Sequence, residues 1–111
     1  MRKGVLDMDA QLKKGLLEVC VLAAIQDEES YGYKIISDVA PYVEISESTL
    51  YPILRRLEQS GAVTTRCVQH NGRLRRYFRI TDVGKQKLRD FKETMKQFQK
   101  ISDFITKGER L

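Results

Sequence analysis

The sequence predicts a mainly α fold with one β-hairpin and a long C-terminal helix. Three observations support this fold class. Apolar residues recur at helical spacing before residue 60, the pair Asn71-Gly72 separates two strand-like runs, and a heptad-like apolar pattern follows residue 81. With 111 residues, the chain has the length of one domain with a modest core.

The first expected helix carries apolar residues over a wide arc. One stripe runs at spacings of four, three and four residues: Leu12, Leu16, Val19 and Ala23. Leu17, Cys20 and Ala24 widen this stripe, so we expect the helix to be buried on more than one side. The polar run 26–30 ends it.

The second expected helix is short and spans about residues 31–39, with an apolar side formed by Ile35, Ile36 and Val39. Pro41 closes this helix, because the residue before a proline is pushed out of the helical region. We therefore expect the chain to leave the helical conformation at Ala40.

The third expected helix starts at Ser46, a residue type that caps helix N-termini well. Its apolar face follows the i, i+3, i+4, i+7 pattern: Leu50, Ile53, Leu54 and Leu57. The opposite face carries a different set: Ser48, Tyr51, Pro52, Arg55 and Gln59. Gly61 supplies the stop signal, and Pro52 costs the helix one backbone hydrogen bond.

A β-hairpin follows, because the residue types of Asn71-Gly72 both tolerate positive φ. A two-residue turn there fixes a register that includes these pairs: His70 with Arg73, Thr65 with Phe78, and Val63 with Ile80. The base of the hairpin is then apolar and its tip is basic. We expect a hairpin whose base docks in the core and whose tip projects from the domain.

The last expected helix is capped by Thr81, and Asp82 suits its positive end. Its apolar seam runs at three-four spacing: Leu88, Phe91, Met95, Phe98, Ser102 and Ile105. Ser102 breaks this seam once, and the seam covers fewer than three heptads. The pattern therefore falls short of a sustained coiled coil.

Three helices followed by a two-stranded wing form a winged helix-turn-helix, a fold that reads DNA with a helix in the major groove. The third helix offers polar side chains for base edges: Ser48, Thr49, Tyr51 and Arg55. The stretch from Gln59 to Thr81 has no acidic residue and five arginines: Arg66, Arg73, Arg75, Arg76 and Arg79. With a net charge of +5, this pattern predicts contact with double-stranded DNA. An ordinary solvated hairpin, the alternative, usually mixes both signs.

Four motifs resemble the PadR family of bacterial winged-helix transcriptional regulators. Residues 46–61 are similar to the family's recognition helix, 31–33 to its second helix, 72–78 to its wing and 81–84 to the opening of its last helix. The resemblance places Pro52 inside the recognition helix, which favours the start at Ser46. With the charge pattern, it implies these DNA-contacting residues: Tyr33, Lys34, Ser46, Ser48, Thr49, Tyr51, Pro52, Arg55, Arg73, Arg75 and Arg76.

Two positions depart from the family pattern. Ser48 stands where Gly is usual, which adds a side chain at the DNA-facing helix start, so we expect a different operator preference. Ala62 stands where a larger aliphatic residue is usual, which predicts a looser joint between helix and wing. The short C-terminal helix resembles the smaller of the family's two subgroups.

The resemblance also implies a homodimer in which each last helix packs on its partner. A winged domain of about 80 residues has little core left to cover the seam, which favours the same conclusion; folding of the helix back onto its own domain is the alternative. The residues expected at the interface are Leu12, Leu16, Leu88, Phe91, Met95, Phe98 and Ile105. Residues 1–81 would then bind DNA, and residues 82–111 would form the dimerisation helix. Such a dimer reads two half-sites one helical turn apart, hence a near-palindromic operator.

Repression is the usual mode of the family, and the resemblance implies release by a small-molecule or stress signal. Some members bind flat aromatic ligands between subunits by means of a tryptophan, and this chain has none. Two alternatives stay open: a metal-sensing winged-helix repressor, and a winged-helix module for protein contacts alone. For the first, Cys67 and His70 have a suitable spacing but point to opposite faces of a strand, and Cys20 lies on another element.

Several other classes are not expected. His70 is the only histidine, and no catalytic arrangement can be argued around it, so neither an enzyme nor a cofactor is predicted. No apolar run approaches about 18 residues, so no membrane segment is expected. Asp7 and Asp9 interrupt what opens like a signal peptide, and two cysteines are too few for a disulfide framework. We expect a cytoplasmic protein.

Overall fold

The computed structural model describes residues 10–107, so the outer ends of the two expected domains lie outside the described residues. The elements in chain order are α1 Ala10–Ala24, α2 Gly32–Val39, α3 Glu47–Gln59, β1 Val63–His70, β2 Arg73–Ile80 and α4 Asp82–Thr106. The expected order of three helices, a hairpin and a last helix is confirmed, as is the mainly α fold class with its hairpin wing. Within residues 10–107, no helix combines the length and apolarity that crossing a bilayer requires.

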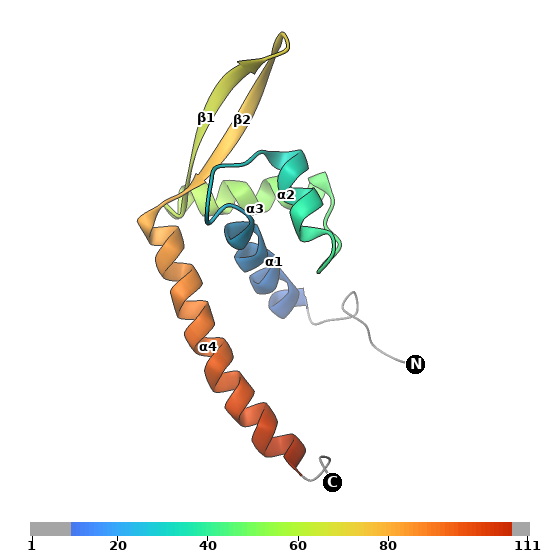
Figure 1. Ribbon diagram of the computed structural model, residues 1–111, viewed down its shortest axis with the longest axis vertical. Coiled ribbons are helices and arrows are strands. Elements are labelled where there is room, and N and C mark those ends of the chain that lie inside the picture. The colour runs from blue at the N-terminus through green and yellow to red at the C-terminus, as the bar shows by residue number, and fades with distance from the viewer. Residues whose placement is uncertain (1–9, 108–111) are drawn as a thin grey trace.

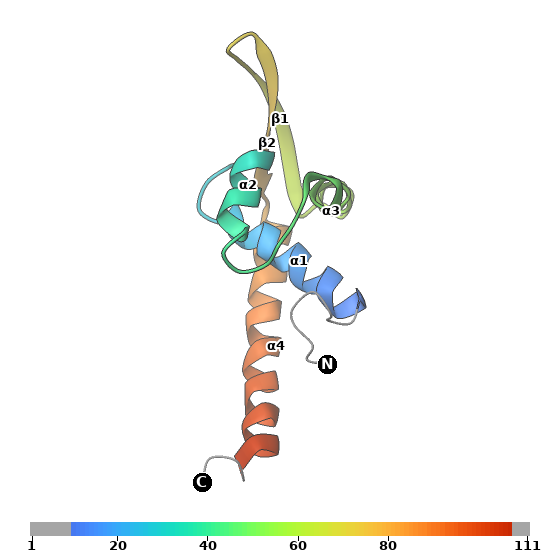
Figure 2. The same cartoon turned by 90° about the vertical axis from the view of Figure 1, so that its right-hand side faces the viewer.

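The molecule is elongated, with principal extents of 60 × 33 × 21 Å. The hairpin projects away from the α1–α3 group, and α4 starts beside the base of the hairpin and runs in the opposite direction (Figure 1). The view turned by 90° shows the same separation (Figure 2). The wing and the outer part of α4 therefore lie at opposite ends of the molecule.

One apolar core joins α1, α2, α3, the base of the hairpin and the first turns of α4. The predicted inner face of α3 is confirmed, since four residues are almost fully buried: Leu50, Ile53, Leu54 and Leu57. Val63, Phe78 and Ile80 dock the base of the hairpin in this core, as expected. Toward the tip, the hairpin leaves the core.

The expected inner stripe of α1 is only partly correct. The fully buried residues of α1 are Leu17, Val21 and Leu22, whereas Leu12 is 56% exposed and Leu16 is half-buried. Toward the end of the helix the wide apolar arc does meet the core, where four partly buried residues pack against it: Val19, Cys20, Ala23 and Ala24. The start of the expected stripe therefore stays apolar and largely uncovered.

The end of α2 differs from the expectation in its mechanism. The helix ends at Val39, but Ala40 keeps helical angles (φ −51°, ψ −39°) and its N–H donates to the carbonyl of Ile36. The expectation that Ala40 leaves the helical region is therefore wrong. Pro41 ends the helix because its nitrogen has no hydrogen to continue the ladder.

The expected start of α3 is confirmed, although not by side-chain capping. Ser46 has the extended backbone of an N-cap, but its hydroxyl bonds no backbone N–H. Instead, its Oγ lies 3.0 Å from Ser48 Oγ and 3.2 Å from Thr49 Oγ1. At the other end, Gly61 takes a positive φ of 81°, as its predicted role as a stop signal requires.

The hairpin register is confirmed pair by pair, from Val63 opposite Ile80 to His70 opposite Arg73. Asn71 and Gly72 take φ values of 50° and 78°, which a primed two-residue turn needs. One contact was not expected: the N–H of Ser30 donates to the carbonyl of Phe78 (3.0 Å), and the N–H of Phe78 donates back (2.7 Å). The turn before α2 is thereby joined to the outer edge of β2.

The joint between α3, the wing and α4 is close-packed, so the expected looser joint at Ala62 is wrong. Ala62 is fully buried, and its carbonyl accepts a hydrogen bond from the N–H of Thr81. A Cβ added to Gly84 would lie 2.4 Å from the Ala62 oxygen. The small residues at 62 and 84 let α4 approach closely. Thr81 caps α4 as predicted, with Oγ1 accepting from the N–H of Gly84 at 3.2 Å.

Candidate nucleic-acid interface

A cleft of about 470 Å³ lies between the wing, the start of α2 and α3. Five of the predicted DNA-contacting residues line it: Tyr33, Tyr51, Arg73, Arg75 and Arg76. The turn residues His70 and Asn71 and the start of α2 complete it. Side chains from three separate segments of the sequence thus meet at one concave, basic surface.

The wing arginines reach this cleft from both faces of β2, because neighbouring strand residues point in opposite directions. The guanidinium of Arg75 lies 4.1 Å from the ring centroid of Tyr31, which holds it against the start of α2. Arg76 lies on the α3 side, where it shares a small cavity with Tyr51 and Arg55. Arg73 is exposed beside the turn.

Tyr51 both packs against Gly32 and lines the cleft. It is 41% exposed at the cleft, yet its hydroxyl lies so close to Gly32 that a Cβ there would be 2.4 Å from it. A side chain at position 32 would therefore displace the Tyr51 ring. The close approach fixes the Tyr51 ring between α2 and α3, with one edge open to a ligand in the cleft.

The remaining predicted residues lie outside the cleft lining. Ser46, Ser48 and Thr49 are exposed at the start of α3, where their hydroxyls contact one another. Pro52 is half-buried within α3. Lys34 lies on α2, where its ammonium donates to Asp38 at 2.9 Å; this hydrogen bond raises the pKa of Lys34.

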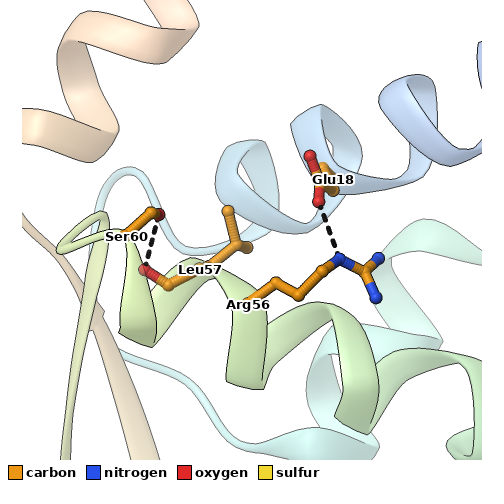
Figure 3. A network of polar contacts seen from close by, with 4 residues as sticks. All are labelled: Glu18, Arg56, Leu57 and Ser60. Atoms are coloured by element: carbon orange, nitrogen blue, oxygen red, sulfur yellow. Dashed lines mark hydrogen bonds and ion pairs between the residues drawn. The ribbon is translucent and has the colours of Figure 1, made fainter.

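Three neighbouring residues of α3 hold the helix in place. Arg56 Nε donates to Glu18 Oε1 of α1 at 3.2 Å, and Ser60 Oγ donates to the Leu57 carbonyl at the end of the helix (Figure 3). Leu57 itself is in the core, and Glu58 accepts a hydrogen bond from Thr65 of β1. Arg56, Leu57 and Glu58, within the recognition-helix motif of residues 46–61, therefore orient α3 toward α1 and the wing.

The sequence analysis missed the contacts between the wing and the turn before α2. Arg66, one of the five hairpin arginines, donates two hydrogen bonds to the carboxylate of Glu29. This pairing lowers the pKa of Glu29 and raises that of Arg66. Tyr31 and Tyr77 lie beside it with their rings edge to face. The partners are 37 residues apart, so no local spacing could reveal them.

The seam of α4 is largely open to solvent. Phe98 is 63% exposed, and the described part of α4 also exposes Met95, Ile101, Phe104 and Ile105. Leu88, expected at a dimer interface, is instead buried in the core of its own chain, because the first turns of α4 pack on α1. Phe91 is half-buried. The uncovered seam thus begins beyond Leu88.

The residues considered for metal sensing, Cys67, His70 and Cys20, do not form a three-ligand site. Cys67 is exposed on β1, three residues from His70, and Cys20 is half-buried on α1, where burial raises the pKa of its thiol. Among residues 10–107, no three His, Cys, Asp or Glu side chains lie where they could hold a metal ion together.

Comparison with known proteins supports the winged-helix fold described above. The model of the PadR-like family of transcriptional regulators matches residues 21–90. Transcriptional regulator Rv3488 of Mycobacterium tuberculosis is 25% identical over 78% of this chain and 82% of its own. A crystal structure from Streptococcus mutans is 36% identical with a TM-score of 0.76, covering 86% and 90% of the two chains. A PadR-like transcriptional regulator from Bacillus cereus is 29% identical with a TM-score of 0.74, covering 86% and 96%.

Proposed function

The chain belongs to the PadR-like family of transcriptional regulators and has their winged-helix fold, and we propose that it binds a near-palindromic operator as a homodimer and represses transcription there. One observation carries the proposal. The wing arginines and the exposed edge of Tyr51 line one cleft. A duplex that enters this cleft would contact the wing arginines and α3 at the same time.

Within this proposal, the predicted residues divide by chemistry. Arginines at the wing tip suit phosphate oxygens, because guanidinium groups donate several hydrogen bonds and stay charged. The polar side chains at the start and outer face of α3 suit base edges: Ser48, Thr49, Tyr51 and Arg55. Lys34 and Tyr33, at the start of α2, flank the same side, although Lys34 must share its charge with Asp38.

The dimer is supported by two apolar surfaces. The seam of α4 exposes Met95, Phe98 and Ile105, and the start of α1 leaves Leu12 exposed and Leu16 half-buried. A second copy of the chain offers matching surfaces, and a two-fold interface uses the same patch on both subunits. Since α4 runs away from the wing (Figure 1), pairing through α4 would keep the two clefts away from the interface.

Repression is the direction that the family resemblance favours, and a cytoplasmic location follows if the regulator reads chromosomal DNA. Release by a small molecule or stress signal remains part of the proposal on the same ground. An aromatic ligand held by tryptophan is not an option for this chain, which has no Trp.

The proposal is tested by selecting fragments of the source genome on the purified protein. We expect enrichment of a near-palindromic site with half-sites one helical turn apart, bound with an affinity that falls steeply as salt rises. A protein-interaction module would enrich no sequence and would show no salt-dependent binding. A metal sensor would change its affinity for the same site when zinc is added or removed.

A further inference from the structure

A line of contacts connects the turn before α2 with the wing. It begins at Glu29, whose Oε2 accepts from Arg66 Nε at 2.9 Å while its Oε1 accepts from a second nitrogen of the same guanidinium. A bidentate pair of this kind fixes the orientation of both side chains. The Arg66 guanidinium in turn lies 5.4 Å from the ring centroid of Tyr77 on β2.

The line continues from Tyr77 toward the cleft. The rings of Tyr77 and Tyr31 meet edge to face, with centroids 5.7 Å apart and planes at 77°. The face of Tyr31 then carries the guanidinium of Arg75 at 4.1 Å. We call these five residues, Glu29, Arg66, Tyr77, Tyr31 and Arg75, the wing clamp. It ends on an arginine that lines the proposed DNA cleft.

The outer part of the wing needs contacts with the rest of the domain to keep a fixed position. A two-stranded hairpin is marginally stable by itself in water, and only the base of this one is in the core. The backbone pairing of Ser30 with Phe78 anchors the hairpin at that base. Beyond it, the wing clamp ties the Arg75 face of the wing to the body of the domain.

We propose that the wing clamp sets the angle of the wing for operator binding and that Glu29 acts in it as a positioning residue. The inference rests on the proposed function. The inference also concerns Arg66. Because the guanidinium of Arg66 is hydrogen-bonded to Glu29, Arg66 is not one of the cations that neutralise DNA phosphates. Arg66 thus serves to orient the hairpin, whereas Arg73, Arg75 and Arg76 are the wing arginines proposed to contact DNA.

The test compares Glu29→Gln with Glu28→Gln in the full chain. Both variants remove one negative charge at adjacent positions, but the structure pairs Glu28 with no arginine among the described residues, and Glu28 is exposed. Affinity is measured for the selected operator and for unrelated duplex. The ratio of the two affinities is the informative quantity, because partial unfolding lowers both affinities together.

We expect Glu29→Gln to lower the ratio of specific to non-specific affinity by about tenfold, within the usual range of coupling between two sites. Glu28→Gln is expected to keep the wild-type ratio. Arg66→Gln should reproduce the loss of specificity while leaving the salt dependence of non-specific binding at its wild-type slope.

Different failures have different meanings. If wild-type protein binds no DNA in a salt-dependent way, the proposed function is wrong and the clamp's role falls with it. If wild-type protein binds its operator but Glu29→Gln behaves like Glu28→Gln, the clamp alone is overturned. A fall of about 0.9 per subunit in the non-specific salt slope of Arg66→Gln would show that Arg66 is a phosphate ligand after all.

Discussion

The side chain of Tyr51 shows how one residue can serve both the fold and the site. Its hydroxyl occupies the space in which a side chain at position 32 would begin, and its exposed edge lines the cleft. Packing against Gly32 limits the positions that the ring can adopt. If Tyr51 contacts bases as proposed, a ring held in this way needs less ordering when DNA binds, which favours affinity and specificity together.

Gly32→Ala tests this contact. The added Cβ would come within 2.4 Å of Tyr51 Oη, so the ring or α2 must shift. We expect a loss of about 1 kcal/mol in the free energy of unfolding, the low end for overpacked sites, because the partly exposed Tyr51 ring can shift. Chemical denaturation measures the loss. Tyr51→Phe removes the hydroxyl, so the double variant should cost at least about 0.5 kcal/mol less than the sum of the single changes.

Gly15→Ala is the matched control for this prediction. Gly15 lies within α1, and a Cβ there would meet no atom within 4 Å. The same change should therefore stabilise the protein by about 0.5–1 kcal/mol, because alanine favours the helix. If Gly32→Ala proved equally harmless, the close contact with Tyr51 could not be the reason for glycine at position 32.

At the residue scale, the sequence predicted which side chains could bind DNA but not how each is held. Tyr51, Arg75 and Arg76 meet in the cleft as expected, since hairpin and helix are both anchored in one core. The pairing of Arg66 with Glu29 could not be foreseen. It joins residues on different elements, and their approach depends on the final packing angle of the wing.

At the scale of elements, the strength of the local signal explains what could be predicted. The two-residue Asn71-Gly72 turn fixes the hairpin register. The apolar base favours the same register, since a shift of one residue would expose it. For α1, the apolar arc is too wide to define which residues are fully buried, so the expected stripe is correct near the end of the helix and wrong at Leu12. For α4, the seam spacing was right, but Leu88 belongs to the core of its own chain.

The seam of α4 leads to a prediction about assembly. Phe98→Glu with Ile105→Glu places two charges on exposed apolar positions, so burial of this surface in a dimer becomes unfavourable. We expect a monomer by sedimentation, with the wing domain still folded. Phe91 is left unchanged, because it is half-buried and its loss could disturb the domain itself.

Lys100→Glu provides the control for the α4 variant. It alters the net charge by the same amount, at an exposed position of α4 outside the seam. This variant should sediment as the wild type does. A Phe98→Glu, Ile105→Glu protein that remains dimeric would place the interface on another surface.

For the whole molecule, the separation of its two ends is the main feature. The cleft lies between the wing and the α2–α3 pair, and the uncovered seam lies on the outer part of α4, on the opposite side of the core (Figures 1 and 2). The proposed dimer through α4 would therefore leave the proposed DNA cleft uncovered. This arrangement could be expected from the sequence only in outline, because the direction in which α4 leaves the core is set by the close packing of Ala62 and Gly84.

The central claim is that wing arginines and α3 hold one duplex across the cleft, and the salt dependence of DNA affinity tests it most directly. Each lost phosphate contact should reduce the slope of log K against log salt by about 0.9. We predict that changing Arg73, Arg75 and Arg76 together to alanine removes about three such contacts per subunit. Arg89→Ala, on the exposed surface of α4, should keep the wild-type slope. An unchanged slope in the triple variant, or an equal loss per arginine in Arg89→Ala, would contradict the account.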